Sequence, residues 1–479
     1  MAAGVTLTKK DGNLGVPVAG ATKALVIGPA SGGTKESLYT FSQTSDVNAT
    51  VGWGPGQVAA ECILQLNGGS IDMYVASASI AGTITTPVSS TIPLLTVTGA
   101  PRDTYSFIGT ITAAGALDAA RWKYTLDGEN YSPEQTLAGS QIIQHSGLTL
   151  TAGTGSYSVG NTISFQAYAP QMSTSDINNC LNDYIKKNTT PTLIYLANDS
   201  QSAASGSALF VAVDIQLTTQ DVKEIFTQAV VPTGGADNTP AAIEAVFASV
   251  AASAGNVVTA VAERARRQVP TSFQGYSNPR LPFALAFAER AHGVKISTNP
   301  ARYADGALTG WSDPTYDEFL NGSTYEPAKL VAPRRFQGDA GLFVNQSLIK
   351  SQTGSDYVYW QWGAVINRAA QVTAAALRRF INSSVRVLTD GSGFIDPRDK
   401  AVIEGYVNKQ LKATIMQPIN AEGTPGHASA IVFSINGQTD VLTTSTLQYT
   451  VALIPLANVS NITGTIGFTD SIPVVAQAA

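Results

Sequence analysis

The chain has 479 residues, of which 44% are hydrophobic and only 13% are charged, and its formal net charge is −5. This length exceeds what one ordinary core can bury and therefore predicts several domains. With no basic run longer than pairs such as Arg334-Arg335, the sequence excludes the dense basic face that sequence-independent nucleic-acid binding requires. Surfaces this poor in charge are common in proteins that pack against copies of themselves, and also in secreted adhesins.

The first element is an extended arm, residues 1–20, whose spaced glycines and few apolar residues bury little by themselves. A buried strand is expected over 24–28, a helix over 56–67 and an alternating strand over 71–77. Asn67-Gly68-Gly69 supplies a typical helix stop between the last two. This β-α-β unit predicts the opening of an α/β domain.

Residues 83–168 have a different texture, because the helical period disappears. Short strands alternate with turn signals in LLTVTG, TYSFIGTIT, ARWKYTLDG, GLTLTAGTG and NTISFQAYA. The pattern predicts a separate β-sandwich inserted into the α/β domain and facing outward. Deleting it and joining its flanks is expected to spare assembly.

The helical period returns after the insert, at 175–187, where Ser173 and Asp176 form a capping box. Thr218 and Asp221 predict the start of another helix, and periodicity does not decide between helix and strand over 257–312. The remaining expected elements are a strand at 192–197, helices from Thr239-Pro240, over 357–387 and from Pro397 to about Ile415, and strands at 447–454 and 462–468.

The segment LVIGPASGGTKE, residues 25–36, has the strand-then-glycine spacing of a phosphate-binding loop. Such a loop needs lysine and then a hydroxyl residue after its last glycine, so that the lysine reaches the phosphates and the hydroxyl holds magnesium. Here Thr34 precedes Lys35, and no helix is expected from Glu36 onward. The sequence therefore predicts a strand-to-loop turn, no nucleotide or other cofactor, and no catalysis.

Metal and hydrolase chemistry also lack their usual residue patterns. His145, His292 and His427 are isolated and are interpreted as surface or loop residues, so no metal site is expected. No G-x-S-x-G nucleophile elbow is present. Cys62 and Cys180 fall on apolar helix positions, which favours a reduced compartment over disulfides.

The sequence does not predict a secretion signal or a membrane-spanning helix. The start, MAAGVTLTKKDG, lacks the apolar stretch of a signal peptide. The small-apolar stretch at 240–262 contains Glu244 and Asn256 and is typical of a soluble helix.

The two ends of the chain form a candidate functional site. Each carries a strand-like segment whose edges must be paired, either inside the subunit or with a neighbour. We expect these arms to join subunits, so that removing residues 2–16 or everything after 445 leaves a folded monomer, and Thr450→Pro weakens assembly more than Thr450→Ala. The proposed arm residues are Val5, Leu7, Leu447, Tyr449, Val451 and Leu453.

The order of these parts resembles that of contractile phage tail sheath proteins. GVPVAGATKALVIGPASGG and AAECILQLNGGSIDMYVASAS resemble the opening of that family. GDAGLFVNQSLIKSQTGSDYVYWQWGAVINRAAQVTAAALRRFINSSVRV, with Asn367-Arg368, is similar to its carboxyl-terminal domain, and TLQYTVALIPLANVSNITGTIGF to its carboxyl-terminal arm. WKYTLDGENYSPE and GLTLTAGTGSYSVGNTISF resemble a β domain inserted in several such proteins.

The resemblance implies an α/β (α+β) multidomain fold with a sheath-type core, an inserted β-sandwich and extended terminal arms. It divides the chain into an arm at 1–20, a discontinuous α/β middle domain at 21–82 and 169–325, the insert at 83–168, a carboxyl-terminal sheath domain near the tube at 326–445, and terminal strands at 446–479.

The resemblance also implies a function. The chain would be a virion protein that is assembled in the host bacterial cytoplasm as stacked hexameric rings around a tail tube. Its partners would be further copies of itself, the tail tube protein, and baseplate and tail terminator proteins, without nucleic acid or membrane insertion. Contraction, driven by bistable packing, would push the tube through the host envelope for genome ejection.

Two other function classes stay open at this point. A virion or secreted β-rich adhesin or fibre fits the low charge and the Thr/Gly-rich insert, although the long helix and the β-α-β opening disfavour it. An α/β hydrolase or nucleotide-using enzyme lacks the required residue patterns.

Overall fold

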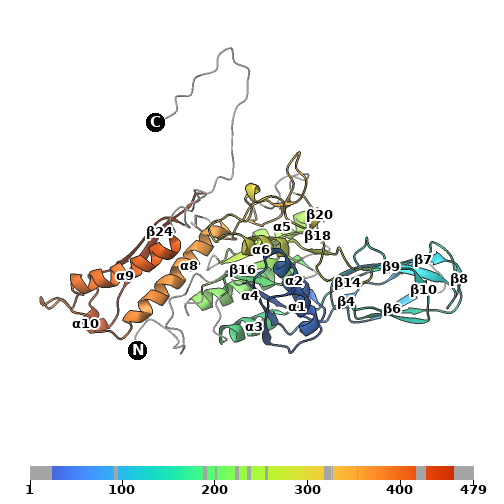
Figure 1. The fold of residues 1–479 in the computed structure, drawn as a ribbon, viewed down its shortest axis with the longest axis horizontal. Coiled ribbons are helices and arrows are strands. Elements are labelled where there is room, and N and C mark those ends of the chain that lie inside the picture. Colours follow the sequence, from blue (N-terminus) through green and yellow to red (C-terminus); the bar gives the residue numbers. More distant parts are fainter. Residues whose placement is uncertain are drawn as a thin grey trace, which may run out of the picture.

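The computed structural model describes residues 24–90, 95–186, 191–199, 202–221, 226–234, 239–253, 257–317, 325, 327–352, 354–355, 357–416 and 428–457. The molecule is elongated, with a central unit around one large sheet, the insert (residues 83–168) at one end and a helical carboxyl-terminal unit (residues 357–457) at the other (Figure 1). It is an α+β multidomain fold, as the sequence predicts.

The central unit is built on a six-stranded sheet. Five strands are parallel, and β2 at one edge runs antiparallel to β3. Strands buried on both faces read as continuous apolar runs, which is why ALVIG and LIYL carry no polar alternation. The order across the sheet is β17 (Val258–Val261), β16 (Gln228–Pro232), β15 (Leu193–Leu196), β1 (Ala24–Gly28), β3 (Ile71–Val75) and β2 (Ser37–Phe41).

Helices cover both faces of this sheet. Alternate residues of β1 divide between two cores, Val26 packing with α2 and Leu25 with α3 and α4. One face carries α1 (Thr44–Val51), α2 (Pro55–Asn67) and α6 (Phe283–Gly293). The other carries α3 (Thr174–Lys186), α4 (Ala203–Asp221) and α5 (Pro240–Ser249).

One of the two helix starts predicted from capping residues is found in the structure, and the other is not. At α3 the capping box is confirmed: Ser173 Oγ is 2.9 Å from Asp176 Oδ2, and the Ser173 amide donates to the same oxygen at 2.8 Å. The start predicted at Thr218 and Asp221 is wrong, because both residues end α4. Thr218 Oγ1 donates to the Asp214 carbonyl at 2.8 Å, the bond that a threonine inside a helix makes with the preceding turn.

The undecided stretch at 257–312 contains both strand and helix. After β17 come β18 (Arg264–Arg267), β19 (Arg280–Pro282), α6, the 3-10 turn η1 (Tyr303–Asp305) and β20 (Trp311–Pro314). β18 is the centre of a three-stranded antiparallel sheet in the order β19-β18-β20. The short hairpin β21 (Pro333–Arg334) and β22 (Phe343–Val344) follows.

The regular elements of the insert, among its described residues, are all strands. Its larger sheet has the order β10-β9-β7-β14-β4, with β5 also on β14, and two smaller sheets are β11-β12-β6 and β13-β8. The side chains of Trp122, Tyr105 and Phe107 in this insert are almost fully buried. The strands are β4 (Thr83–Ile84), β5 (Val88–Ser89), β6 (Leu95–Gly99), β7 (Tyr105–Ala113), β8 (Gly115–Ala116), β9 (Arg121–Thr125), β10 (Gln135–Thr136), β11 (Ser140–Ile143), β12 (Leu148–Ala152), β13 (Ser156–Tyr157) and β14 (Thr162–Tyr168).

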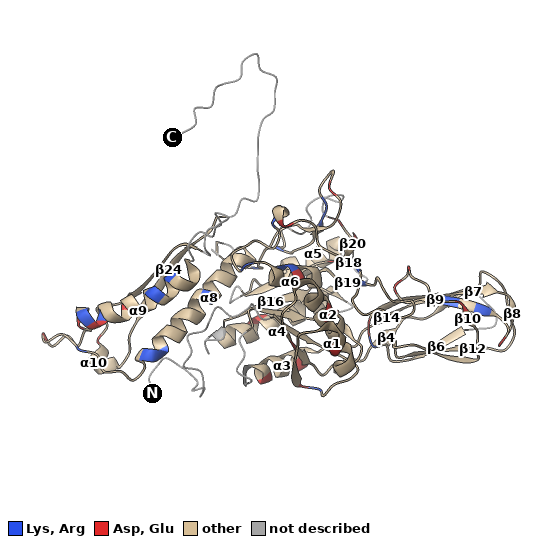
Figure 2. Ribbon diagram, viewed as in Figure 1, with Lys and Arg blue, Asp and Glu red and all other residues tan. Residues whose placement is uncertain are grey.

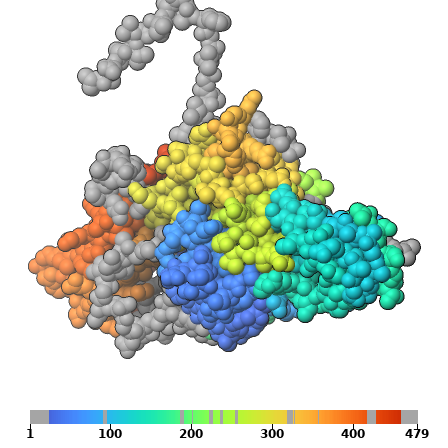
Figure 3. Space-filling model, turned by 45° about the vertical axis from the view of Figure 1, so that its right-hand side comes forward, coloured from blue at the N-terminus to red at the C-terminus, as the bar shows by residue number. Residues whose placement is uncertain are grey.

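The insert projects as a lobe, but its base is packed against the central unit (Figure 3). At this junction Trp53 of the central unit lies 4.7 Å from the ring centres of both His145 of the insert and Phe273. Tyr276 stacks on Phe273 and meets Tyr105 of the insert edge-on. Deleting the insert would uncover these rings, so a deletion meant to spare assembly also needs polar residues at Phe273 and Tyr276.

The carboxyl-terminal unit pairs two helices with a hairpin. Its elements are α8 (Trp360–Leu377), the 3-10 turn η2 (Arg378–Phe380), α9 (Pro397–Ile415), β23 (Ala428–Ile435), α10 (Val441–Thr444) and β24 (Tyr449–Pro455). The helix expected over 357–387 begins at Trp360 and ends at Leu377. It does not resume after η2, because the chain turns at Asn382, whose φ is 60°. Val385 lies beyond the end of the helix but still packs against the core that α8 forms with α9 and β23.

Charged side chains are sparse throughout, and those of the carboxyl-terminal unit gather on α9 and the end of α8 (Figure 2). No helix in the described part of the chain combines the length and the apolar character needed to cross a bilayer.

Candidate functional site

The space in front of α2, where a phosphate would lie in a nucleotide-binding loop, is filled by the chain itself. The Gly56 amide at the start of α2 donates to the Pro29 carbonyl at 3.1 Å, and a Cβ at Gly54 would lie 2.7 Å from that oxygen. Lys35 Nζ donates to the Ala30 carbonyl. The strand β2 then begins at Ser37 in place of a helix, so the predicted strand-to-loop turn is confirmed.

Because Lys35 binds the loop's own backbone, Lys35→Ala is expected to leave assembly unchanged and to lower stability by about 1 kcal/mol for the lost hydrogen bond. Calorimetric titration with ATP and GTP should show no saturable heat for either protein. Micromolar binding that disappears in the variant would contradict this expectation.

Of the three histidines, His292 contradicts its predicted place, whereas His145 lies in a loop as predicted. His292 is buried in α6, and burial lowers its pKa, so its interpretation as a surface or loop residue is wrong. His145 lies in a tight turn at the junction, with φ 61°. His427 lies outside the described residues. Within the described ranges, no three His, Cys, Asp or Glu residues gather as metal ligands would.

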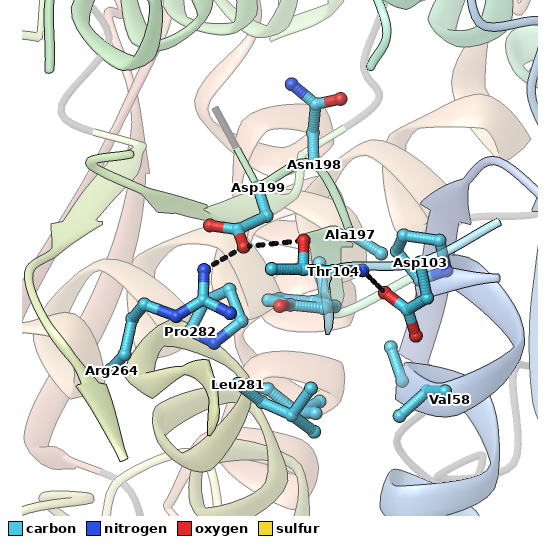
Figure 4. Close-up of a pocket in the computed structure, with 13 residues that line it drawn as sticks. Val58, Asp103, Thr104, Ala197, Asn198, Asp199, Arg264, Leu281 and Pro282 are labelled. Atoms are coloured by element: carbon cyan, nitrogen blue, oxygen red, sulfur yellow. Dashed lines mark hydrogen bonds and ion pairs between the residues drawn. The ribbon is translucent and has the colours of Figure 1, made fainter. Parts of the chain in front are cut away.

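Two adjoining pockets lie at the carboxyl edge of the central sheet. The chain leaves β1 toward one edge of the sheet and leaves β15 toward the other. The carboxyl ends of two such strands are the usual ligand position in open α/β sheets. They share Asp199, Arg264 and Pro282 (Figure 4). Arg264 is paired with Asp199, and Thr104 Oγ1 donates to the same carboxylate at 3.3 Å. The polar groups therefore satisfy one another, and we assign no ligand to the pockets.

The hairpin β23–β24 is the candidate assembly site. The register pairs Ile431 with Leu453 and Phe433 with Val451, and these side chains join the core formed with α8 and α9. Tyr449 lies on the same side of β24 but is 44% exposed, and Leu447, which precedes the strand, packs against the same core. Val5 and Leu7 lie outside the described residues. The opposite side carries Val432 and Ile454, exposed to 54% and 61%.

The backbone register shows which groups of β24 face outward. Asn436 N–H donates to the Gln448 carbonyl at 2.8 Å, and Ser434 lies opposite Thr450. Since alternate residues of an antiparallel strand bond to opposite edges, Thr450 bonds toward β23, whereas Val451 and Leu453 point their backbone groups to the outer edge. No strand of the described chain pairs with that edge.

This register corrects the use of Thr450→Pro as an assembly test. Proline there would break the hairpin inside the subunit, because the Thr450 amide faces β23. The sequence analysis also missed β23, although Asn436-Gly437 after AIVFSI is a turn signal of the kind that accompanies strands. Trp362 Nε1 donates to the Leu456 carbonyl at 3.0 Å and fixes the end of β24 on α8.

A family model, described as the amino-terminal domain of DUF2586, matches residues 2–347. The chain belongs to the DUF2586 family. The match covers the central unit and the insert and ends before α8. A search of curated proteins gave no match for this DUF2586 chain.

Solved structures share the fold of this DUF2586 chain. The contracted helical sheath of the anti-feeding prophage is 12% identical, with a TM-score of 0.52 over 98% of this chain and 100% of that one. A chain of the contracted baseplate of the same particle is 11% identical, with a TM-score of 0.51 over 97% of each. A sheath tail protein of Listeria innocua is 13% identical, with a TM-score of 0.47 over 91% and 96%. The two likenesses with TM-scores above 0.5 show that the DUF2586 chain shares the fold of the prophage sheath chain and of the baseplate chain.

Proposed function

We propose that this chain is a structural subunit of a contractile tail sheath. It polymerises as stacked hexameric rings around a tail tube and contracts to drive the tube through the host envelope, without enzymatic activity. The observation that carries the proposal is the likeness to a contracted helical sheath over 98% of this chain and the whole of the other. A likeness that includes the insert, the central unit and the terminal hairpin fits a common assembly better than a shared catalytic domain.

The outer edge of β24 is the proposed contact between subunits. A strand from a neighbouring copy, supplied by residues after 457, adds to this edge by β-augmentation, and the amino-terminal segment with Val5 and Leu7 is the second arm. Each backbone hydrogen bond contributes only about 1 kcal/mol net. Several in one register, attached to a hairpin that α8 and α9 hold in place, form a tether that tolerates movement between subunits.

The other partners follow from the same proposal. The carboxyl-terminal unit faces the tail tube, the insert faces outward, and the ends of the polymer meet the baseplate and the tail terminator. Assembly takes place in the bacterial cytoplasm, and the product is part of the virion tail. The likeness to a chain of a contracted baseplate supports the baseplate contact in particular.

Negative-stain microscopy of the concentrated protein tests the proposal. Rings or tubes are the expected result, whereas thin rods would favour the adhesin or fibre alternative and overturn the sheath assignment.

A matched pair of variants tests the arm contact within the same experiment. Val451→Pro removes a backbone donor at the outer edge of β24 and is expected to abolish tubes, while Val451→Ala keeps the donor and is expected to retain them. Circular dichroism should show that both variants are folded. Tubes formed equally well by both would show that subunits are joined elsewhere.

A further inference from the structure

Two carboxylates of the insert bind the same loop of the central unit. Asp103 accepts a hydrogen bond from the Tyr276 hydroxyl at 3.0 Å. Asp127 accepts the Ser277 and Asn278 amides at 3.0 and 2.9 Å. The Leu126 amide also donates to the Gly275 carbonyl at 2.6 Å. The loop at 273–280 is therefore a socket that holds the insert by two different carboxylates.

The Asp127 contact is made by an ionised carboxylate. Besides the two socket amides, its oxygens accept the Glu129 and Asn130 amides at 2.9 and 2.8 Å. Burial acts to raise the pKa of Asp127, but these donors outweigh burial and hold the pKa below its usual range. Asp127 therefore stays ionised, and able to accept these hydrogen bonds, throughout the neutral and mildly acidic range.

The Asp103 contact has the opposite character. Asp103 is 5% exposed and accepts hydrogen bonds from the Tyr276 hydroxyl and, at 2.8 Å, from the Thr104 amide. Burial, with a smaller contribution from the nearby Asp199, raises its pKa to about 6 against the effect of these two hydrogen bonds. The apolar side chains of Val58 and Leu281 line the same pocket (Figure 4). A charge at this position is poorly solvated.

Other titratable groups surround Asp103 on every side of the junction. Arg264 favours the ionised form of Asp103, and Asp199 neutralises much of that effect by pairing with Arg264. His145 at the outer end of the junction has its pKa lowered by burial and by Arg102, so its protonation works against packing. The titratable groups that interact with Asp103 are Tyr105 from the insert, Asp199 after β15, Arg264 on β18 and Tyr276 in the socket. Arg102 acts on the neighbouring Tyr105, and Cys62 on α2 acts on Tyr276.

We propose that the junction between the insert and the central unit is an acid-tightened joint, in which proton uptake by Asp103 seats the insert in the socket and proton loss loosens it. Asp127 stays ionised in both states, so its contacts with the socket do not themselves titrate, and the two chain connections keep the insert attached when the joint opens. The orientation of the insert thus responds to pH, while the fold of each unit does not.

The sign follows from linkage. The carboxyl of Asp103 binds its proton more tightly in the closed joint, near 6, than when released to water, near 3.8. Its contribution to closure is therefore fully present below the released value and declines as the pH rises through about 6. Between pH 5 and pH 8 these two values predict an increase of about tenfold in the opening constant of the joint. His145 acts in the opposite direction and reduces the increase in the wild type.

Hydrogen exchange of the full chain, monitored on peptides covering 125–130 and 275–279, measures the opening directly. After correction for intrinsic exchange, wild-type protection at both peptides is expected to fall from pH 5 to pH 8. Asp103→Asn carries no charge and is expected to keep high protection at both pH values. Asp127→Asn makes the same chemical change in the same joint, and it should lower protection at both pH values without removing the pH dependence.

The outcomes separate clearly. Equal protection of the wild type at pH 5 and pH 8, or an unchanged pH dependence in Asp103→Asn, would overturn the proposal. Should Asp103→Asn fail to fold, Tyr276→Phe supplies a second test, because it removes a donor to the ionised carboxylate. That variant is expected to show a larger loss of protection on the way to pH 8 than the wild type, and a loss no larger than that of the wild type would also overturn the proposal.

Discussion

Removal of residues 458–479 is expected to leave a folded monomer that no longer polymerises, whereas removal of residues 446–479 is expected to unfold the carboxyl-terminal unit. The shorter deletion keeps β24, which pairs with β23 over its whole length. The longer deletion removes Leu447, Val451 and Leu453 from the core. Each partly buried side chain contributes on the order of 1 kcal/mol, and the inner face of β23 would lose its cover.

Analytical ultracentrifugation with imaging distinguishes these results, and circular dichroism reports folding. Removing residues 2–16 is a useful comparison, because it leaves every described contact of the hairpin in place. Tubes formed by the 458–479 deletion would show that the tail supplies no contact between subunits. A folded monomer from the 446–479 deletion would agree with the expectation from sequence alone and would contradict the role of β24 in the core.

The elements that sequence predicts well are those in which one local pattern decides the outcome. α2, α3 and α9 have a single apolar face and a recognisable cap or stop, and their bounds agree with the expected ranges to within one or two residues. The predicted start at Thr218 and Asp221 failed because the same residue types also occur inside a helix, where a threonine bonds the preceding turn. α4 is apolar on most of its surface, so the sequence shows no clear helical period over its length.

The junction could not be predicted, because its partners are far apart in the chain. Asp127 and Ser277 are separated by 150 residues, and no local pattern connects them. The Asp127 side chain binds a loop that lies in the stretch 257–312, where periodicity did not decide between helix and strand. The candidate arm residues were found from alternation alone, but which of them expose backbone groups depends on a partner strand, β23, that the sequence analysis overlooked.

Breaking the buried ion pair between Arg267 and Glu289 is expected to cause the largest loss of stability of any single substitution discussed. The pair joins β18 to α6, with a distance of 3.2 Å between Arg267 Nη2 and Glu289 Oε1 and side-chain exposures of 4% and 0%. Trp311 Nε1 donates to the other carboxylate oxygen at 2.6 Å. Arg267→Ala leaves Glu289 buried without its cation and should lower the free energy of unfolding by about 3–5 kcal/mol.

Urea denaturation measures this loss, and three comparisons test its cause. Arg121→Ala breaks an exposed pair with Glu134 at 2.9 Å and should have little effect, since water screens both partners. The double variant Arg267→Met with Glu289→Leu should cost less than the sum of the single changes, because it leaves no unpaired charge behind. Burial raises the pKa of Glu289, so the loss in Arg267→Ala should shrink as the pH falls and the carboxyl takes up a proton. A loss no larger than that of Arg121→Ala, or one that grows on acidification, would mean that water reaches the pair and that the link between β18 and α6 rests on apolar packing instead.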